Sequence, residues 1–386
     1  MSRRLRVAMI GHGFMGAAHS VGWRQAPAMF DLPAEVEMAV LVGRDAAAVE
    51  SSARHWGWVS SATDWRDVVA RDDIDIVDIV TPGGTHAEIA QAALASGKHV
   101  LCEKPLANTL PEAEAMAAAA ETSGACALAG FTYRRLPATA LIRRMIGEGR
   151  IGRVRQVRAA YRQDWLVDAQ APLVWRLQKE HAGSGALGDI GAHIIDMVHF
   201  VTGQRVESVS GTLETVVERR PVLHEGRGLS GTAGDGWGEV TVDDLAIFSG
   251  RLSDGALASF EATRFATGRK NSLTIEVSGS SGALVWDLER LNEVQFYDRT
   301  ATSTAQGFTT ILVTEPEHPY AAAWWPPGHG LGYEHGFVHQ ARDFVAAIAG
   351  DEPLHSTFAE GLDVQRVLAA VEDSAQHGSV WTPVRS

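Results

Sequence analysis

Residues Leu5–Gly16, LRVAMIGHGFMG, join a short apolar run to three glycines with the spacing G-x-G-x-x-G. In a dinucleotide-binding turn the first glycine permits a tight bend, and the second lets the pyrophosphate approach the backbone. The third lets a helix pack close to the strand, and the N-terminus of that helix offers free N–H groups to phosphates. The stretch therefore predicts a strand, a phosphate-binding turn and a helix. The residues expected at the nucleotide are Gly11, Gly13, Phe14, Met15 and Gly16.

Outward from this turn, apolar strand-like runs alternate with helix-like stretches as far as residue 130. Short, almost wholly apolar strands separated by helices are typical of a parallel sheet covered on both faces. We therefore expect an α/β domain, a doubly wound Rossmann sheet, over residues 1–132. The predicted strands are Leu5–Ile10, Val36–Val42, Ile74–Val80, His99–Cys102 and Ala125–Ala129. The predicted helices are Met15–Gln25, Ala46–Trp56, His86–Ser96 and Pro111–Thr122.

After Tyr133 the order of elements changes, because strand-like runs follow one another without helices between them. Turns such as Ser253-Asp254-Gly255 separate neighbouring runs, which predicts an antiparallel meander in an α+β domain over residues 133–386. The last helix can return to the first domain, and the glycine-rich stretch Gly226–Gly238 is predicted to be a mobile loop. The predicted strands are Val154–Tyr161, Val206–Val217, Val240–Leu252, Ala256–Thr263, Ser272–Gly279, Ala283–Leu288 and Glu293–Tyr297. The predicted helices are Ala138–Glu148, Leu187–Thr202, Gly336–Ala349 and Ala359–His377.

The composition excludes several classes of partner. With 34 basic and 47 acidic side chains, the formal net charge is −13, so nucleic acid and anionic membranes are poor partners. No apolar stretch approaches the roughly 20 residues that span a bilayer, and the N-terminal apolar run breaks too early for a signal peptide. The two cysteines, Cys102 and Cys126, lie in apolar runs, and no Cys/His cluster has the spacing of a zinc site. We expect a soluble, cytoplasmic protein without a metal.

The end of the second predicted strand bears on the choice of cofactor. An acidic residue there would bind the ribose 2′-hydroxyl of NAD. This chain has Gly43-Arg44-Asp45 instead, and Arg44 could receive the 2′-phosphate of NADP or lie along the adenine. The sequence thus leaves NAD and NADP open, with Arg44 favouring NADP slightly.

Two motifs follow later strands of the predicted parallel sheet, and a third opens a helix in the second half. Thr81-Pro82-Gly83-Gly84-Thr85-His86 and Glu103-Lys104-Pro105 stand at carboxyl ends of strands, and Asp189 and His193 lie in Gly185–His193. Together these motifs resemble those of the glucose–fructose oxidoreductase/inositol dehydrogenase (Gfo/Idh/MocA) family. The resemblance implies an open, mainly antiparallel second sheet and a homotetramer or homodimer. It also implies that Thr81, Pro82, His86, Glu103 and Lys104 contribute to the cofactor site.

The same resemblance implies a chemistry for three residues, Lys104, Asp189 and His193. An imidazole has an ordinary pKa near 6.5, so His193 suits removal of a hydroxyl proton while hydride leaves for nicotinamide. Lys104 can polarise the reacting oxygen as alkoxide character develops. Asp189 is four residues before His193, so it either orients the imidazole or contacts a sugar hydroxyl itself.

A narrower likeness points to a substrate class. Phe131–Arg135, Gln163-Asp164-Trp165 and Trp175–Lys179 are similar to the levoglucosan dehydrogenase subgroup, which oxidises a pyranose hydroxyl at C3 with NAD. Flat tryptophan faces suit ring C–H groups, and amide and guanidinium groups give directional hydrogen bonds. The chain departs from that subgroup at Thr132, at Gly43-Arg44 and at Gly83–Thr85. The implied substrate-binding residues are Tyr133, Gln163, Trp165, Trp175, Arg176, Asp189 and His193.

The sequence leaves several functions open. The leading interpretation is hydride transfer between a ring hydroxyl of a sugar, glycoside or cyclitol and NAD(P), with a small carbohydrate as the only ligand besides the cofactor. The alternative is a redox-neutral glycosidase, in which transient C3 oxidation permits elimination at C1. Arg176, Lys179 and His181 form a basic cluster that suits an anionic group on the sugar, such as a sulfonate, or a solvated helix face. The segment Trp324–Tyr333 either covers a pocket or makes an oligomer contact.

Overall fold

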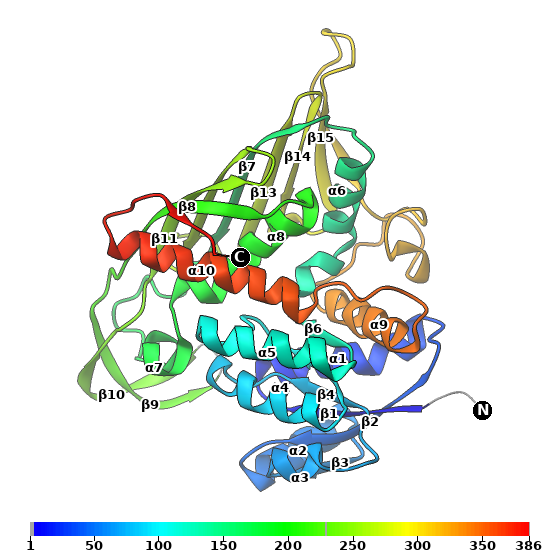
Figure 1. Cartoon of the computed structure of the whole chain (residues 1–386), viewed down its shortest axis with the longest axis vertical. Coiled ribbons are helices and arrows are strands. Elements are labelled where there is room, and N and C mark those ends of the chain that lie inside the picture. Colours follow the sequence, from blue (N-terminus) through cyan, green and yellow to red (C-terminus); the bar gives the residue numbers. More distant parts are fainter. Residues whose placement is uncertain (1–3, 228–229, 386) are drawn as a thin grey trace. The chain divides into compact units, whose positions relative to one another are not determined.

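The computed structural model describes residues 4–227 and 230–385, which form two compact units (Figure 1). The first unit contains residues 1–135 and 332–362, and the second contains residues 136–331 and 363–386. The segment 332–362, which we expected in a domain over residues 133–386, thus belongs with the N-terminal residues. Among the described residues, no helix is long and apolar enough to cross a membrane.

The first unit is built on a six-stranded sheet in which every neighbouring pair of strands is parallel. The strand order β3-β2-β1-β4-β5-β6 is that of a doubly wound sheet, which confirms the predicted Rossmann fold. The prediction missed β3, because three small or polar residues at a sheet edge carry no apolar period. The strands are β1 (Arg4–Ile10), β2 (Glu35–Val42), β3 (Ser60–Ala62), β4 (Ile76–Ile79), β5 (His99–Cys102) and β6 (Ala127–Ala129).

Local signals set most helix ends in this unit. The Asp45 side chain accepts a hydrogen bond from Ala48 N at the start of α2, and Gly57 ends that helix in the left-handed conformation. Thr109 and Glu112 form a capping box at the start of α5. The predicted end of the first helix at Gln25 is wrong, because α1 continues through Pro27 to Met29. The helices are α1 (Phe14–Met29), α2 (Ala46–Trp56), α3 (Trp65–Val69), α4 (His86–Ala95), α5 (Leu110–Ser123) and α9 (His335–Ala349), with short 3-10 turns η1 (Gly83–Thr85) and η2 (Thr132–Arg135).

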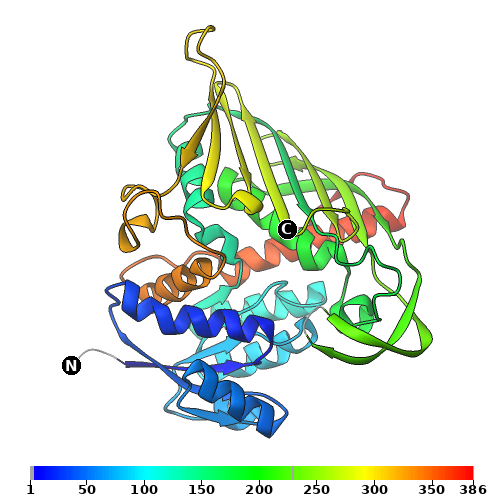
Figure 2. The same ribbon diagram turned by 180° about the vertical axis from the view of Figure 1, so that it is seen from behind.

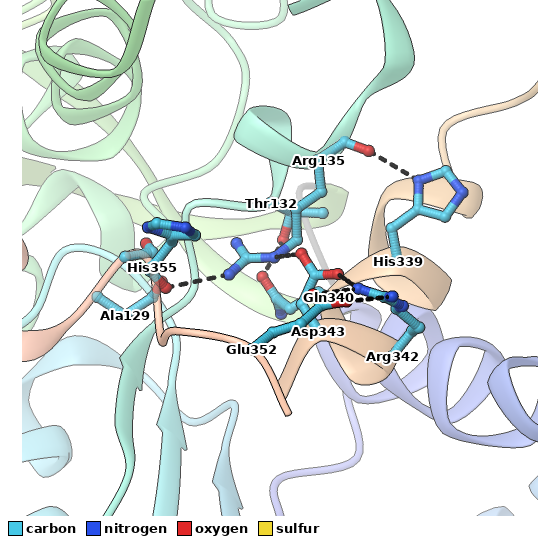
Figure 3. Close-up of polar contacts among 10 residues, drawn as sticks. Ala129, Thr132, Arg135, His339, Gln340, Arg342, Asp343, Glu352 and His355 are labelled. Atoms are coloured by element: carbon cyan, nitrogen blue, oxygen red, sulfur yellow. Dashed lines mark hydrogen bonds and ion pairs between the residues drawn. The ribbon is translucent and has the colours of Figure 1, made fainter. Parts of the chain in front are cut away.

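Helix α9 joins the first unit through close packing on α1. A Cβ atom at Gly22 of α1 would lie 2.7 Å from the carbonyl oxygen of Phe337, so the absence of a side chain permits this approach. Figure 3 shows the polar contacts that hold the same segment to η2. Thr132 Oγ1 donates to Gln340 Oε1 at 2.9 Å, and Arg135 Nε donates to Asp343 Oδ2 at 3.2 Å. These contacts explain why residues 332–362 belong to the first unit.

The second unit is built on a nine-stranded sheet of order β16-β15-β14-β13-β7-β12-β11-β8-β17. All neighbours are antiparallel except β7 and β12, which confirms a mainly antiparallel sheet. The predicted meander is present in two parts, β8-β11-β12 and β13-β14-β15-β16, and β7, the first strand in sequence, lies between them. The strands are β7 (Val154–Arg162), β8 (Val206–Glu214), β11 (Leu245–Leu252), β12 (Leu257–Thr263), β13 (Ser272–Gly279), β14 (Gly282–Asp287), β15 (Glu293–Asp298), β16 (Phe308–Leu312) and β17 (Thr382–Pro383).

The predicted glycine-rich loop is a hairpin. Strands β9 (Arg219–Arg227) and β10 (Ser230–Glu239) form a separate two-stranded antiparallel sheet, and residues 228 and 229 lie outside the described residues. A hairpin needs only paired backbone groups, which glycines supply as well as other residues do. A Cβ atom at Gly238 would lie 2.5 Å from Leu173 Cδ2, so a side chain at that position would require Leu173 to shift.

Helices cover one face of the nine-stranded sheet. Helix α8 packs on β7 and β13, and α6 packs on β14 and β15, while Figure 2 shows the sheet from the opposite face. On that opposite face Arg158 of β7 donates to Glu276 of β13 at 2.8 Å. The helices of this unit are α6 (Pro137–Gly147), α7 (Lys179–Ala182), α8 (Ala192–Thr202) and the part of α10 (Phe358–Gln376) from Asp363 onward, with short helical turns η3 (Trp175–Leu177), η4 (Leu187–Gly191), η5 (Leu288–Arg290) and η6 (Ala321–Ala323).

Candidate functional site

The three glycines of the first turn differ in what surrounds them. Gly11 has φ +112°, and a Cβ atom there would lie 3.0 Å from the backbone of Val80. At Gly16 a Cβ atom would lie 2.7 Å from the carbonyl oxygen of Gly11, so this glycine permits the close contact of helix and turn. At Gly13 nothing lies within 4 Å, and Gly13 caps α1 without a side-chain hydrogen bond. The backbone at Gly13 is thus open on the side of a Cβ atom, directly before α1, and the first N–H groups of such a helix are the ones that bind phosphate.

The sequence motifs of the first unit follow adjacent strands. The glycine turn follows β1, Thr81 and Pro82 follow β4, and Glu103-Lys104 follows β5. Since β1 and β4 are parallel neighbours where the strand order reverses, these segments lie at the carboxyl edge that binds ligands in such sheets.

His86 links two of these segments. Its Nε2 lies 2.8 Å from the Thr81 carbonyl oxygen, and its Nδ1 lies 3.1 Å from the Pro105 carbonyl oxygen. Burial lowers the pKa of His86, so the imidazole is neutral and donates to one of these oxygens at a time. The ring is buried, and its contacts place His86 as a support for the loops on either side of it.

The end of β2 explains the glycine at position 43. A Cβ atom at Gly43 would lie 2.4 Å from Cδ2 and 2.7 Å from Nε2 of His12, the residue between the first two glycines. The imidazole of His12 thus fills the space from which an acidic side chain would extend, and its Nδ1 lies 3.3 Å from Ser52 Oγ. Arg44 is exposed, and Asp45 caps α2.

Part of the aromatic segment Trp324–Tyr333 lies beside the glycine turn. The ring of Tyr333 stacks on Phe14 with centroids 6.4 Å apart, and it meets Tyr133 edge-on at the same distance. Burial raises the pKa of the Tyr333 phenol, and Tyr133 and Glu103 raise it further. Tyr333 is therefore a neutral hydroxyl next to the nucleotide turn. Sequence analysis could not place it, because only the fold brings it to Phe14.

In the second unit, Asp189 lies on a π-helical turn and His193 lies in the first turn of α8. Sequence analysis predicted one continuous helix here. The turn η4 is held by Asp243, whose carboxylate accepts hydrogen bonds from Gly185 N and Leu187 N at 2.7 Å each. Single π-helical turns at α-helices are frequent at functional sites. The ring of Tyr161 meets the His193 imidazole with centroids 5.8 Å apart.

Arg264 is a site residue that the sequence did not reveal. Its Nη2 donates to Asp189 Oδ2 at 2.9 Å and to the Gly185 carbonyl oxygen at 3.2 Å. The guanidinium carbon lies 5.3 Å from the centre of the Trp165 ring. Arg264 thus connects the predicted substrate residues Asp189 and Trp165. A single arginine after a strand carries no motif, so only the structure identifies it.

The other predicted substrate residues of the second unit form two groups. Gln163 Nε2 donates to Asn271 Oδ1 at 2.8 Å, and Trp165 Nε1 donates to Gln163 Oε1 at 3.0 Å. Arg176 lies over its neighbour Trp175, 4.4 Å from the ring centre. Burial lowers the pKa of Arg176, whereas the charge of Asp189 raises it, so these two residues are near each other.

Within the predicted basic cluster, Lys179 makes an ion pair with Glu372 of α10 at 4.0 Å. Within residues 4–227 and 230–385, no group of three or more His, Cys, Asp or Glu side chains is arranged to hold a metal ion.

The parallel sheet, the open glycine turn and the motifs at its carboxyl edge define a dinucleotide-dependent oxidoreductase. Residues 5–131 match the family described as an oxidoreductase family with an NAD-binding Rossmann fold, and residues 139–285 match the GFO/IDH/MocA C-terminal domain. The chain therefore belongs to the Gfo/Idh/MocA oxidoreductase family, with NAD or NADP as its cofactor.

Relatives match the chain over its whole length. Levoglucosan dehydrogenase of Pseudarthrobacter phenanthrenivorans is 40% identical over 387 aligned residues, covering 99% of this chain and 98% of the relative. The crystal structure of an oxidoreductase domain protein from Kribbella flavida is 55% identical, with a TM-score of 0.94 and full coverage of both chains. A levoglucosan dehydrogenase in complex with NADH and levoglucosan is 39% identical, with a TM-score of 0.93 and full coverage of both chains.

Proposed function

We propose that the protein oxidises a ring hydroxyl of a sugar, the C3 hydroxyl of a pyranose such as levoglucosan, and transfers the hydride to NAD(P)⁺. The full-length likeness to levoglucosan dehydrogenase supports this substrate class. The observation that carries it is the group formed by Asp189, Arg264 and Trp165, in which an ionic hydrogen-bond acceptor lies beside an aromatic face. Such a pairing suits a sugar, which offers hydroxyls and apolar C–H faces together.

Three side chains have roles in the proposed reaction. His193 accepts the proton of the reacting hydroxyl, and Lys104 stabilises the negative charge that develops on that oxygen. Asp189, held by Arg264, accepts a hydrogen bond from a sugar hydroxyl and so fixes the ring. NAD(P)⁺ at the glycine turn supplies the hydride acceptor, with contacts from Thr81, Pro82 and Glu103-Lys104.

Five further residues are assigned to recognition of the sugar. We propose that Tyr133, Gln163, Trp165, Trp175 and Arg176 contact the substrate. We further propose that the protein is a cytoplasmic homotetramer or homodimer, and light scattering of the purified protein tests the oligomeric state.

The test is a screen of levoglucosan, inositols, neutral glucosides and anionic sugars with NAD⁺ and with NADP⁺. Reduced cofactor and released aglycone are both measured. A dehydrogenase forms one NAD(P)H per turnover, whereas a redox-neutral glycosidase releases aglycone without net reduction. Release of aglycone without NAD(P)H would replace the proposed function by the glycosidase.

The proton acceptor is tested with His193→Ala on the best substrate of the screen. Loss of general base catalysis lowers kcat by about 10²- to 10⁴-fold, while NADH binding is retained. His55→Ala, which removes an exposed imidazole of α2, is the matched control and leaves kcat unchanged. Full turnover by His193→Ala would show that another group takes the proton.

A further inference from the structure

A buried ionic group adjoins Lys104 in the first unit, and the proposed mechanism gives no role to the histidine at its centre. His19 of α1 is only 2% exposed, Asp78 of β4 is completely buried, and Glu103 after β5 is 5% exposed. His19 Nδ1 lies 3.0 and 2.9 Å from the two carboxylate oxygens of Asp78. Its Nε2 lies 3.0 Å from Glu103 Oε1. The imidazole therefore bridges two carboxyl groups from different strands.

The contacts of His19 indicate its charge. Both ring nitrogens face carboxyl oxygens, and a doubly protonated ring donates a hydrogen bond to each of two carboxylates. Burial alone would lower the pKa of His19, but Asp78 and then Glu103 outweigh it and raise the pKa to about 10. Trp23 Nε1 donates a further hydrogen bond to Asp78 Oδ2 at 2.7 Å, which stabilises the second negative charge.

Glu103 is fixed by this imidazolium on one side and by backbone on the others. Its Oε2 accepts a hydrogen bond from Lys104 N at 3.2 Å. A Cβ atom at Gly130 would lie 2.9 Å from Glu103 Oε1, so the chain leaves just enough room for the carboxylate. A buried carboxylate without a partner is strongly disfavoured. Loss of the His19 charge would therefore remove the partner of Glu103 Oε1, and we expect the carboxylate and the adjoining Lys104 to move.

We propose that the His19 imidazolium is a positioning residue for Lys104, acting through the carboxylate of Glu103. This role rests on the proposed function only in so far as Lys104 contacts the reacting oxygen. Asp78 of β4 holds the His19 ring in place through its carboxylate. The contacts of this ring therefore connect α1, β4 and Glu103 after β5. His19, three residues after Gly16 of the nucleotide turn, thus supports Lys104, which follows β5.

The charge of His19 is tested on the wild-type protein by ¹⁵N NMR of labelled histidines. We expect both nitrogens of His19 to be protonated at pH 8, where an ordinary histidine is neutral. The His19→Gln variant identifies the resonance. A neutral His19 at pH 8 would overturn the proposal, whatever the substrate of the enzyme is.

The effect on Lys104 is tested with His19→Gln and, as a matched control, His55→Gln at an exposed position of α2. Lysines are reductively methylated with ¹³C, and Lys104 is identified with Lys104→Arg. We expect the Lys104 resonance to shift in His19→Gln and to stay in place in His55→Gln. An unmoved Lys104 resonance would contradict the proposal without bearing on the substrate.

Kinetics provide the second readout. A small displacement of a catalytic group costs up to about 100-fold in rate, so we expect His19→Gln to lower kcat by about 10- to 100-fold. We expect the Kd for NADH to change by a smaller factor than kcat, because the glycine turn that binds the pyrophosphate is intact. If His19→Gln does not fold, the double variant His19→Gln/Glu103→Gln removes the unpaired charge, and it should fold with the same low kcat. Wild-type kcat in either variant would overturn the role.

Discussion

Asp189 and Arg264 form a 2.9 Å ion pair in which the guanidinium is almost completely buried and the carboxylate is 29% exposed. The arginine therefore approaches Asp189 from the protein side and leaves the carboxylate accessible to solvent. The same guanidinium binds the Gly185 carbonyl oxygen, so it also fixes the turn that precedes Asp189. Arg264 thus pairs with a predicted substrate ligand and fixes its position.

We expect Arg264→Gln to raise the KM for the sugar by about tenfold. A hydrogen bond to a charged group contributes about 1.5–3 kcal/mol, and about 1.4 kcal/mol corresponds to a factor of ten. We expect NADH binding to be unchanged, because the observed contacts of Arg264 are with Gly185, Asp189 and Trp165 rather than with the glycine turn. Steady-state kinetics and calorimetry measure the two effects. Arg269→Gln, an exposed arginine nearby in sequence, is the control. Equal KM values for wild type and Arg264→Gln would remove the positioning role.

Two glycine substitutions should separate nucleotide binding from stability. A side chain at Gly13 meets no protein atom within 4 Å, so Gly13→Val should fold with a melting temperature within about 2 °C of wild type and lose NADH binding by at least about 100-fold. Gly16→Ala collides with the Gly11 carbonyl, and we expect it to lose about 1–3 kcal/mol of stability. Thermal melts and NADH titration test both variants. NADH binding by Gly13→Val with wild-type affinity would contradict the assignment of the turn.

The contact between His12 and Gly43 predicts how cofactor preference can be changed. Gly43→Asp alone collides with the His12 ring and should weaken binding of both cofactors. In His12→Ala/Gly43→Asp the carboxylate has room to bind a ribose 2′-hydroxyl and to repel a 2′-phosphate. We expect the ratio of kcat/KM for NAD to that for NADP to rise by about tenfold or more.

A single substitution, Arg44→Asp, should shift that ratio in the same direction if the arginine contacts a 2′-phosphate. Arg54→Asp, at an exposed position of α2, controls for the change in charge. An unaltered ratio in Arg44→Asp would remove Arg44 from cofactor selection. An unaltered ratio in the double variant would show that the 2′ position lies elsewhere.

The sequence predicted what local chemistry determines and missed what distant contacts determine. Asp45 and Gly57 delimit α2 by capping alone, so its predicted ends are the observed ones. The placement of β7 between β12 and β13 depends on long-range pairing, which no local pattern encodes. Likewise Arg264 is 75 residues from Asp189, and its neighbours in sequence do not indicate the partner. The sequence shows that glycine replaces the expected acidic residue at position 43. The reason, close contact with the His12 ring, is visible only in the folded structure.

The buried His339 of α9 should make folding sensitive to acid. Its Nδ1 lies 2.7 Å from the Arg135 carbonyl oxygen, which requires a proton on that nitrogen (Figure 3). Burial is the main cause that lowers the pKa of His339, to about 3, and the nearby charges of His335, Arg135 and Arg342 lower it further. In the unfolded chain the ordinary value is about 6.5. Between these values the unfolded state binds more protons, so stability falls as the pH falls from about 6.5 towards 3.

We therefore expect the unfolding free energy of His339→Gln to fall less steeply than that of wild type as the pH falls from 6.5 to 4. The difference between the two slopes corresponds to about one proton bound on unfolding. Urea denaturation at half-unit pH steps measures the two slopes. His19 does not interfere, because its raised pKa of about 10 places its loss of stability on the alkaline side, between about 6.5 and 10. His55→Gln should keep the wild-type slope, since that imidazole is exposed. The same slope in wild type and His339→Gln would mean that other groups cause the acid sensitivity, and that His339 becomes protonated without unfolding the first unit.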